Sequence, residues 1–387
     1  MTRAALKVSE REIADTEAVR EFSLIKNAGD VSISCYEKDI PAFVADEMRN
    51  LYENIFSSLE KFKALGEMNG ACAYVLRRGD MVSSAFLFLK EGKRVHVLNE
   101  FIRIDDEELK QFTRYIFERY DDVTIISFRA IQPGITAFPY PHQRHNCIED
   151  IVLTLPDSVQ EYQTRLGKNM RKNVKTYLER IKRKYPSFSY AVYDTPDVDE
   201  DHIRSIIRFN RERTVSKNKA VGIDKDEIEK TIELVKSCGM VAAVTIDGEI
   251  CAGKLFFKVG DNYFSLLNAH SPEFNEYRLG TLCNYLSICE CIARGGKEYH
   301  FLWGREEFKY RFLGEQRDYD EMVIYRSSLG MLMNGRIALN TALMGRARQI
   351  RLWMLDPKRK DSRALIFAKR ALRYFRGRTP PQDKQEG

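Results

Sequence analysis

The sequence predicts an α/β protein with a mixed α+β sheet, formed by two related halves that follow one another along the chain. Two stretches show the same order of elements: three short strands joined by tight turns, an amphipathic helix, and one more strand. The equivalent turn glycines, Gly79 and Gly248, lie about 169 positions apart. A repeat with such a long period is typical of two related domains and not of a solenoid.

The first stretch begins CAYVLRRGDMVSSAFLFLKEGKRVHVL and reads as three strands separated by turns at Gly79 and Gly92. The next segment, DDEELKQFTRYIFERY, carries apolar residues at helical spacing and therefore predicts a helix with an acidic start at positions 105–108. The β-branched run VTIISF predicts the strand that follows this helix.

The second stretch, VAAVTIDGEICAGKLFFKVGDNYFSLLNAH, repeats this pattern with turns at Gly248 and Gly260. The segment RLGTLCNYLSICECIAR then predicts a helix whose first residues, positions 278–281, include no acidic side chain. The run EYHFLW predicts the strand after this helix, and the strand ends at Gly304.

Three helices are predicted between the halves. Apolar residues over 159–185 step by three or four, which predicts one long amphipathic helix. Within 165–184 this helix carries nine Lys or Arg and one Glu. Shorter helices are predicted near 202–214 and over 225–238.

The composition is that of a soluble protein with an ample core, with 44% hydrophobic and 30% charged residues and no long uncharged apolar run. The N-terminus lacks the apolar region of a secretory signal. We interpret the eight scattered cysteines as reduced thiols. Cys289 and Cys291 point to different faces of a helix, so we expect no metal site. These features indicate a cytoplasmic protein.

The formal net charge of +6 is unevenly distributed along the chain. Residues 346–378 carry twelve Lys or Arg against two Asp, a local net charge of +10, so the rest of the chain sums to −4. An apolar stripe accompanies these charges, which is typical of peripheral binding to an anionic membrane, here the inner membrane surface. The alternative is that residues 346–378 form basic helices that pack onto the main body of the protein.

The helix start at 278–281 is a candidate pyrophosphate site. A helix N-terminus presents free backbone N–H groups and a partial positive charge, and glycine lets a phosphate approach the backbone. Arg278 adds a cation and Thr281 a hydroxyl donor; a tight entry turn is the plain alternative. The acidic residues at 105–108 would repel a phosphate, so the second half is expected to bind the cofactor while the first is structural.

The segment HSPEFNEYRLGTLCNYLSICECIARGGKEYHFLWGREEFKYRF is similar to the signature of the CelD/BcsL-type, BioF-like acetyltransferase domain. This domain is a branch of the GNAT superfamily and is related in fold to the FemAB aminoacyl transferases. The basic helix from Arg165 resembles the Arg-rich helix that opens the domain. The matching residues are Gly280, Thr281 and Leu282 at the helix start, and Phe301, Gly304, Glu306, Lys309 and Phe312 in and after the strand.

The sequence departs from that signature at five positions. It has Arg278 where the family usually has serine, Leu279 for proline, His300 for aspartate, Arg305 for an acid and Phe308 for tyrosine. The loss of the acid at position 300 indicates altered substrate choice or weakened catalysis.

The resemblance implies acyl-CoA as donor, used as a co-substrate, and an amine as acceptor. In folds of this superfamily one strand splays from its neighbour, and the pantetheine arm of CoA pairs with the free edge. Here that strand would be 263–268, and the splayed neighbour would be 299–303. The implied CoA-binding residues are Leu267, Asn268, Arg278, Leu279, Gly280 and Thr281.

The candidate catalytic residues follow Gly304, with one exception. Glu306 would take a proton from the attacking ammonium, directly or through water, and Tyr310 would return one to the departing thiolate. Lys309 would bind an acidic acceptor or anchor the loop, and His270, beside the cofactor strand, is a second candidate base. The structural alternatives are an ion pair between Glu306 and Lys309, a core position for Tyr310 and a surface position for His270.

We therefore expect a GNAT-type acyltransferase that moves an acetyl or longer acyl group from acyl-CoA to an amine; the resemblance alone suggests an amino sugar in cell-surface polysaccharide biosynthesis. One alternative is a FemAB-like transferase that uses aminoacyl-tRNA and a cell-wall precursor, the only case in which nucleic acid would take part. Another is a catalytically inactive GNAT-fold binding module. The basic helix at 165–184 is either a solvated face or a surface for an anionic substrate, nucleic acid or the 3′-phosphate of CoA.

The expected organisation has five parts, and the resemblance covers the third of them best. These parts are an N-terminal extension at 1–30, a degenerate GNAT-like half at 31–150, a catalytic GNAT-like half that binds acyl-CoA at 151–325, a basic amphipathic helical segment at 326–378, and a disordered tail at 379–387.

Overall fold

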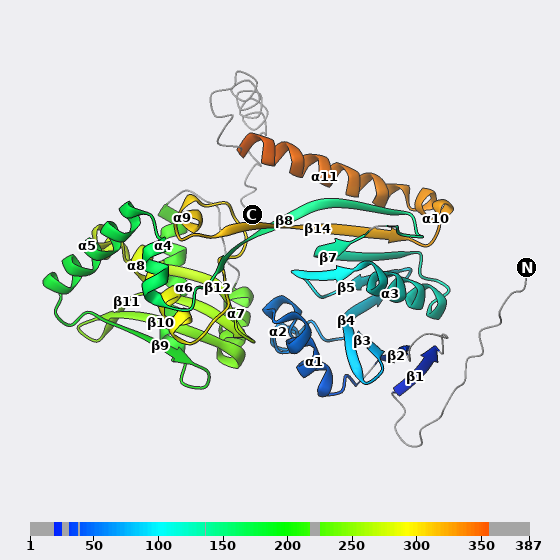
Figure 1. Cartoon of the computed structure of the whole chain (residues 1–387), viewed down its shortest axis with the longest axis horizontal. Helices are drawn as coiled ribbons and strands as arrows, with labels where there is room; N and C mark the ends of the chain where they lie inside the picture. Colours follow the sequence, from blue (N-terminus) through cyan, green and yellow to red (C-terminus); the bar gives the residue numbers. More distant parts are fainter. Residues whose placement is uncertain (1–18, 25–30, 38, 136, 217–224, 356–387) are drawn as a thin grey trace, which may run out of the picture.

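The computed structural model describes residues 19–24, 31–37, 39–135, 137–216 and 225–355. The predicted tail and the part of the predicted basic segment after residue 355 lie outside these described residues, as does most of the predicted N-terminal extension. Within the described part, fourteen strands form one continuous mixed sheet that runs through both halves of the molecule (Figure 1).

The strand order across the sheet is β1-β2-β3-β4-β5-β7-β14-β8-β13-β12-β11-β10-β9, and β6 also pairs with β7. In chain order the strands are β1 (Val19–Leu24), β2 (Val31–Tyr36), β3 (Ala71–Arg78), β4 (Met81–Glu91), β5 (Arg94–Val97), β6 (Ile102–Asp105), β7 (Ile125–Gly134), β8 (His142–Thr154), β9 (Ser189–Asp194), β10 (Gly239–Ile246), β11 (Glu249–Val259), β12 (Asn262–His270), β13 (Glu298–His300) and β14 (Glu315–Tyr325).

Helices cover the faces of this sheet (Figure 1). The α-helices are α1 (Phe43–Tyr52), α2 (Leu59–Ala64), α3 (Asp106–Arg119), α4 (Val159–Arg165), α5 (Lys168–Lys184), α6 (Glu200–Ser216), α7 (Lys225–Cys238), α8 (Leu279–Ala293), α9 (Glu307–Arg311), α10 (Ser328–Met333) and α11 (Gly335–Leu355). Two short 3₁₀ helices are η1 (Ile55–Ser57) and η2 (Pro272–Tyr277).

The predicted repeat is visible in the order of the elements, since β3-β4-β5-α3-β7 and β10-β11-β12-α8-β13 follow the same scheme. In each half three antiparallel strands precede a helix, and the strand after the helix runs parallel to the third strand. Gly79 and Gly248 close equivalent hairpins with positive φ values of 61° and 83°, a backbone region that favours glycine. The predicted mixed α/β fold of two tandem halves is confirmed.

The two halves exchange their last strands, which the sequence did not predict. β8 follows β7 in the chain, but one of its edges pairs with β13 of the second half. β14 follows the second half, but it pairs with β7 of the first half and with β8. The hydrogen bonds of these crossed strands join both halves into a single sheet.

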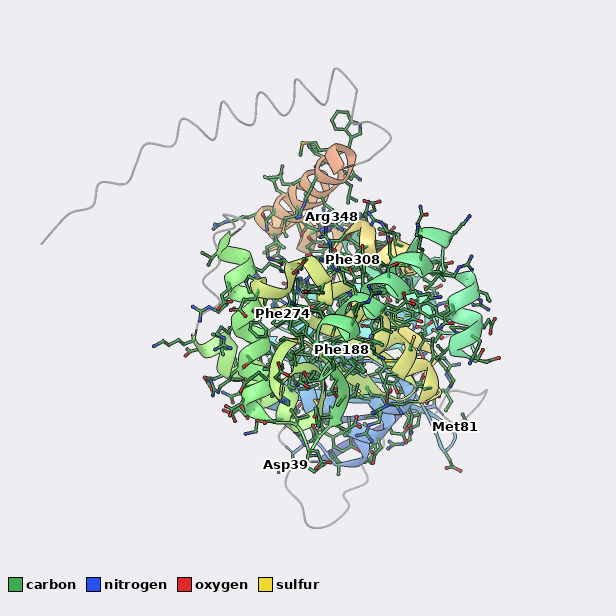
Figure 2. The ribbon with its side chains drawn as sticks, turned by 90° about the vertical axis from the view of Figure 1, so that its left-hand side faces the viewer. Asp39, Met81, Phe188, Phe274, Phe308 and Arg348 are labelled. Atoms are coloured by element: carbon green, nitrogen blue, oxygen red, sulfur yellow. The ribbon has the colours of Figure 1, made fainter. Side chains whose placement is uncertain are left out.

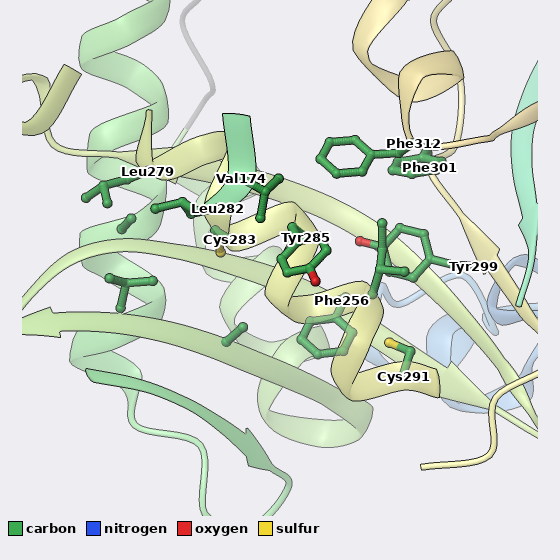
Figure 3. Close-up of a cluster of buried hydrophobic side chains, with 14 of the residues drawn as sticks. Val174, Phe256, Leu279, Leu282, Cys283, Tyr285, Cys291, Tyr299, Phe301 and Phe312 are labelled. Atoms are coloured by element: carbon green, nitrogen blue, oxygen red, sulfur yellow. The ribbon is translucent and has the colours of Figure 1, made fainter. Parts of the chain in front are cut away.

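Apolar side chains of the second half pack on both faces of the sheet. One cluster lies between the sheet and helices α4, α5 and α8, and Figure 3 shows Leu282 and Cys283 of α8 together with Phe256 and Tyr299 of the sheet. Another cluster lies between the opposite face and helices α6 and α7. The sheet is therefore the middle layer of a three-layer arrangement.

The single long helix predicted over 159–185 is two helices, α4 and α5, separated at Leu166 and Gly167. Leu166 is extended, with φ −61° and ψ 141°, and its side chain is 2% exposed in the second-half core. The free energy gained by burying this leucine exceeds that of one more helical turn, because the glycine after it adopts the bent conformation at a low conformational cost. The basic residues predicted at 165–184 lie mainly on α5, whose side chains are mostly exposed.

Helix α11 lies across β8 and β14 (Figure 1). Thr341 and Gly345 are buried against the sheet, and a Cβ at Gly345 would lie only 2.9 Å from the Cβ of His145. Gln143 of β8 donates a side-chain hydrogen bond of 3.1 Å to the carbonyl of Ala338. Among the described residues, no helix combines the length and the apolar character needed to cross a membrane.

Candidate functional site

The main feature of the second half is the point where β12 and β13 separate. Within the described residues their parallel pairing covers only 262–264 of β12 and 298–300 of β13. Beyond that point Phe301 donates its N–H to the carbonyl of Ile151 at 2.8 Å, and Ile151 donates to the carbonyl of Leu302 at 3.3 Å. The chain after β13 thus follows β8, which leaves the edge of β12 from Ser265 onward facing a cavity.

The cavity has a volume of about 840 Å³ and lies between β12, the start of α8, the C-terminal half of α6 and the loop after β13. Most of the site residues predicted from the sequence come together here. Those that line it are Leu267, Asn268, His270, Arg278, Gly280, Thr281, Glu306 and Lys309. Two predicted residues are not part of the lining: Leu279 is buried in the core, and Tyr310 lies on the outer side of α9.

The start of α8 is open to the cavity. Arg278 occupies the N-cap position in a left-handed conformation, with φ 55° and ψ 40°, and no side chain caps the helix. A Cβ at Gly280 would lie 3.3 Å from Nδ1 of His270, so the helix start and the end of β12 are in close approach. Asn268 donates a hydrogen bond of 2.9 Å to the carbonyl of Gly280 and fixes this approach.

Lys309 anchors the loop that forms the opposite wall. Its side chain is 7% exposed, and its ammonium donates to the carbonyls of Leu302 at 3.1 Å and Trp303 at 2.5 Å. It also pairs with the Glu306 carboxylate at 3.1 Å. Burial lowers the pKa of Lys309, although Glu306 acts in the opposite direction. The ion pair weighed as a structural alternative is therefore present, and Lys309 holds the loop in shape.

Glu306 itself stays accessible, because its side chain is 57% exposed at the cavity wall. Gly304 has φ 95°, and a Cβ there would lie 2.6 Å from a carboxylate oxygen of Glu306. Glycine is thus required for the turn that presents this carboxylate. Tyr310 is 37% exposed and its hydroxyl donates to Gln316 at 3.3 Å, and burial raises its pKa.

His270 lies at the end of β12, at the cavity wall. Its Nε2 is 3.0 Å from the side-chain oxygen of Asn275, and its Nδ1 faces Gly280. The imidazole therefore lies beside the start of α8, next to the proposed phosphate position.

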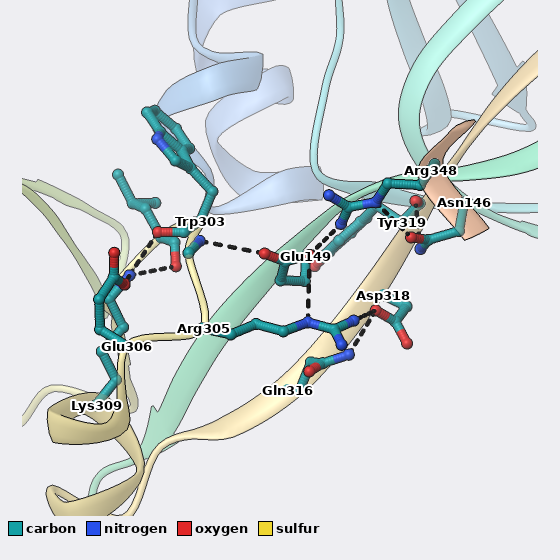
Figure 4. Close-up of polar contacts among 12 residues, drawn as sticks. Asn146, Glu149, Trp303, Arg305, Glu306, Lys309, Gln316, Asp318, Tyr319 and Arg348 are labelled. Carbon is teal, nitrogen blue, oxygen red and sulfur yellow. Dashed lines mark hydrogen bonds and ion pairs between the residues drawn. The ribbon is translucent and has the colours of Figure 1, made fainter. Parts of the chain in front are cut away.

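Glu149 of β8 was not singled out from the sequence, yet it organises the turn after β13 (Figure 4). It is 5% exposed, and its Oε1 accepts the N–H of Gly304 at 3.3 Å. Its Oε2 pairs with Arg305 at 3.6 Å and with Arg348 of α11. The unusual Arg305 is thus matched by a buried acid from the first half of the chain. Glu149 links α11 to the loop that carries Glu306.

His300, another departure, belongs to a buried charge cluster and does not line the cavity. Its Nδ1 is 2.6 Å from Asp150 and its Nε2 is 3.3 Å from Glu298, and its ring stacks on Phe264 at 4.3 Å. Burial lowers the pKa of His300, but the hydrogen bonds and charges of the two carboxylates outweigh it, and the net pKa is raised. Through its contact with Asp150, the imidazole fastens β13 to β8 where β12 departs.

Lys254 lies beneath the cavity and was also missed. It is 0% exposed, and its ammonium donates to Oδ1 of Asn284 at 2.5 Å and to the hydroxyl of Tyr299. Burial lowers the pKa of Lys254 to about 8. Asn284 lines the cavity, so the hydrogen bond from Lys254 to its side-chain oxygen fixes the orientation of this amide relative to the cavity. A lysine inside the apolar strand AGKLFF was the signal in the sequence.

Comparisons with known proteins agree with this geometry. Residues 168–310 match the sequence model of the GNAT acetyltransferase domain. The structure is similar to FemX, with a TM-score of 0.55 and 11% identity over 76% of this chain and 98% of that one. It is also similar to a conserved protein of unknown function from Bacteroides thetaiotaomicron VPI-5482, with a TM-score of 0.50 and 12% identity over 75% and 99% of the two chains.

No curated protein sequence matches the chain. At such low identities the solved structures show the fold and say nothing of the activity. The chain thus shares the fold of FemX, and residues 168–310 are similar to the GNAT acetyltransferase domain. The resemblance noted in the sequence is confirmed at this level.

Proposed function

We propose that this protein transfers an acyl group from acyl-CoA to an amine acceptor. The observation that carries the proposal is the open edge of β12 beside the uncapped start of α8. An open strand edge offers N–H and C=O groups that the amides of a pantetheine arm pair with as an added strand would. A helix N-terminus offers N–H groups and a partial positive charge to a pyrophosphate.

The size and charge of the cavity support a phosphorylated co-substrate. A volume of about 840 Å³ falls in the range of small-molecule and cofactor sites. Arg278 and Arg213 line the cavity, and the basic helix α5 packs beside α8. In this proposal Arg278 binds the pyrophosphate, and α5 contributes positive potential toward the 3′-phosphate.

The proposed reaction is an attack of the amine nitrogen on the thioester carbonyl. The C–N bond forms, the C–S bond breaks, and CoA leaves as a thiolate. Glu306 accepts the proton that the attacking ammonium must lose, directly or through water, because it is the accessible carboxylate at the cavity wall. Tyr310 does not line the cavity, so we assign to solvent both the removal of the second proton that the nitrogen loses after the attack and the protonation of the thiolate.

Two other functions use the same fold. A FemAB-like transferase would place the end of an aminoacyl-tRNA in this cavity, and the structural likeness to FemX favours keeping this alternative. A binding module without turnover would bind CoA only. An amino sugar of a cell-surface polysaccharide is our proposal for the acceptor of the acyltransferase, and it is supported by the sequence resemblance alone.

A binding experiment separates these functions. We expect CoA to bind the wild-type chain in isothermal titration calorimetry and binding to be lost in Gly280→Asp, which places a carboxylate at the start of α8. Gly335→Asp is the matched control, because Gly335 begins α11 with open space around it. Binding of tRNA without CoA would support the FemAB-like alternative, and CoA binding without transfer to any amine would support a binding module.

A further inference from the structure

The outer face of α10 and α11 carries an unusual concentration of exposed apolar side chains. Most of the large apolar side chains exposed among the described residues belong to these two helices. Six of them are between 57% and 78% exposed: Leu329, Leu332, Met333, Leu339, Leu343 and Ile350. They point away from the sheet, because Thr341 and Gly345 form the buried side of α11.

The charge on this face has one sign. Positions 328–355 contain four arginines and no aspartate or glutamate. Arg348 turns inward to Glu149, whereas Arg336, Arg346 and Arg351 are exposed. Large apolar side chains and arginines therefore share one exposed surface, which is the composition of helices that lie in a membrane interface.

We propose that the outer face of α10 and α11 docks on an anionic lipid bilayer. The leucines would enter the boundary between headgroups and acyl chains, and the arginines would contact lipid phosphates. The structure places this surface on residues 328–355, whereas the sequence pattern located the lipid contact at 346–378. The proposal does not depend on the acyltransferase function.

Charge decides between a bilayer and the other occupants of such a face. A second copy in a two-fold dimer would bring the same arginines against themselves without any acid to pair with them. The chain's own residues 356–378 carry nine Lys or Arg and two Asp, so they would meet the same repulsion. An anionic bilayer supplies both an apolar layer and the negative charge that this face needs.

The surface is also held rigidly relative to the cavity. Gly345 brings α11 into contact with β8, and Arg348 pairs with Glu149, which accepts the N–H of Gly304 in the cavity loop. Docking through α11 would therefore fix the cavity at a defined orientation to the membrane plane, which suits an acceptor attached to lipid.

The test uses the full chain and sedimentation with vesicles of phosphatidylcholine alone or mixed with phosphatidylglycerol. We expect binding to the mixed vesicles and not to the neutral ones, and only at low salt, since salt screens the charges of the arginines. The double variant Leu339→Glu, Leu343→Glu should lower the partition coefficient at least about tenfold. Arg346→Gln should lower it about fivefold, and Arg346→Lys should restore it.

The control is Met81→Glu, which changes an equally exposed apolar residue (76%) on the opposite side of the molecule from Arg348 (Figure 2). It should bind vesicles as the wild type does. All variants should keep CoA affinity, so a loss of CoA binding would concern the proposed function and not this surface.

Three results would overturn the proposal. One is equal partition of the wild type and the double variant, and another is equal partition onto neutral and anionic vesicles. The third is a wild-type dimer in light scattering that becomes monomeric in the double variant, because a second copy would then cover this face.

Discussion

Helices α3 and α8 occupy the same place in the two halves, but their starts differ in chemistry. Asp105 caps α3 by accepting the N–H of Glu108 at 2.7 Å, and the Glu108 carboxylate accepts the N–H of Asp105 at 3.3 Å, a complete capping box. The start of α8 has Arg278 and Gly280 and no side-chain cap. Side chains satisfy the N-terminus of the first helix, whereas no side chain caps the N-terminus of the second.

The strands before these helices differ in the same way. In the first half, β6 continues the parallel pairing with β7 as far as Gly134, so no edge is left open. In the second half, the pairing of β12 with β13 ends at Phe264 and His300. The first half therefore lacks both the open strand edge and the uncapped helix start of the second half, and its strand β7 pairs with the exchanged strand β14.

A third difference lies in the middle strands. Phe86, the sixth residue of β4, packs on Phe112 of α3, whereas Lys254, the sixth residue of β11, bonds to Asn284 of α8. Because burial lowers the pKa of Lys254 from its ordinary 10.5 to about 8, the unfolded chain holds this proton more tightly than the folded one. Its stabilising contribution is therefore lowest below pH 8 and rises as pH increases toward 10.5.

The largest expected effect on stability follows from that pKa. Relative to Lys254→Met, the wild type should gain on the order of 3 kcal/mol of unfolding free energy between pH 8 and 10.5. Urea denaturation of both proteins across this range measures the difference. Phe86→Met in the first half is the matched control, and its difference from the wild type should not change with pH. Parallel curves for wild type and Lys254→Met would show that the lysine titrates normally.

The largest expected effect on activity is that of Glu306→Gln, which keeps the shape of the side chain and removes the proposed catalytic base. Turnover at neutral pH should fall on the order of 10²-fold, the usual value of general-base catalysis, while CoA affinity is kept. The deficit should shrink as pH rises, because more of the amine is already deprotonated. Glu307→Gln, on the exposed neighbour, serves as control. Near-normal turnover across the pH range would exclude Glu306 and direct attention to His270.

A smaller effect is expected when the first half's cap is copied into the second. Arg278→Asp installs a carboxylate at the N-cap of α8, and aspartate tolerates the left-handed conformation found there. CoA affinity should fall at least about tenfold, because a cationic partner is replaced by an anion. Calorimetry with CoA and a thermal melt check this prediction, and the melting temperature should stay or rise. Unchanged affinity would place the pyrophosphate elsewhere.

The smallest effect is expected from the reverse change. Asp105→Ala removes the cap of α3 and should cost about 1 kcal/mol of unfolding free energy. CoA affinity should not change, since the first half binds no co-substrate in this account. A loss of CoA affinity in this variant, with the fold intact by circular dichroism, would contradict the division between the halves.

Local patterns in the sequence predicted the elements and much of the cavity lining. Apolar spacing placed α7 at 225–238 as observed, and turn glycines separated the strands of both halves. The helix start at 278–281 was visible because its charge contrasts with 105–108. These features depend on residues close in the chain.

What the sequence did not predict depends on distant residues. The exchange of β8 and β14 is decided by pairing between strands more than 150 positions apart, which leaves no local pattern. No local pattern marks Glu149, and Lys254 is marked only as a lone lysine in an apolar strand; the contacts of both residues with distant parts of the chain reveal their roles. Tyr310 was a candidate because it follows Gly304 closely in the chain, but it does not line the cavity.

We propose that the second half alone binds CoA, at the open edge of β12 and the start of α8. Hydrogen–deuterium exchange with and without CoA tests it most directly, because it reads backbone amides in both halves of the same protein. We expect CoA to slow exchange at 265–270 and 279–283 and to leave the equivalent amides at 94–109 unchanged. Protection at 94–109, or equal protection in both halves, would contradict it.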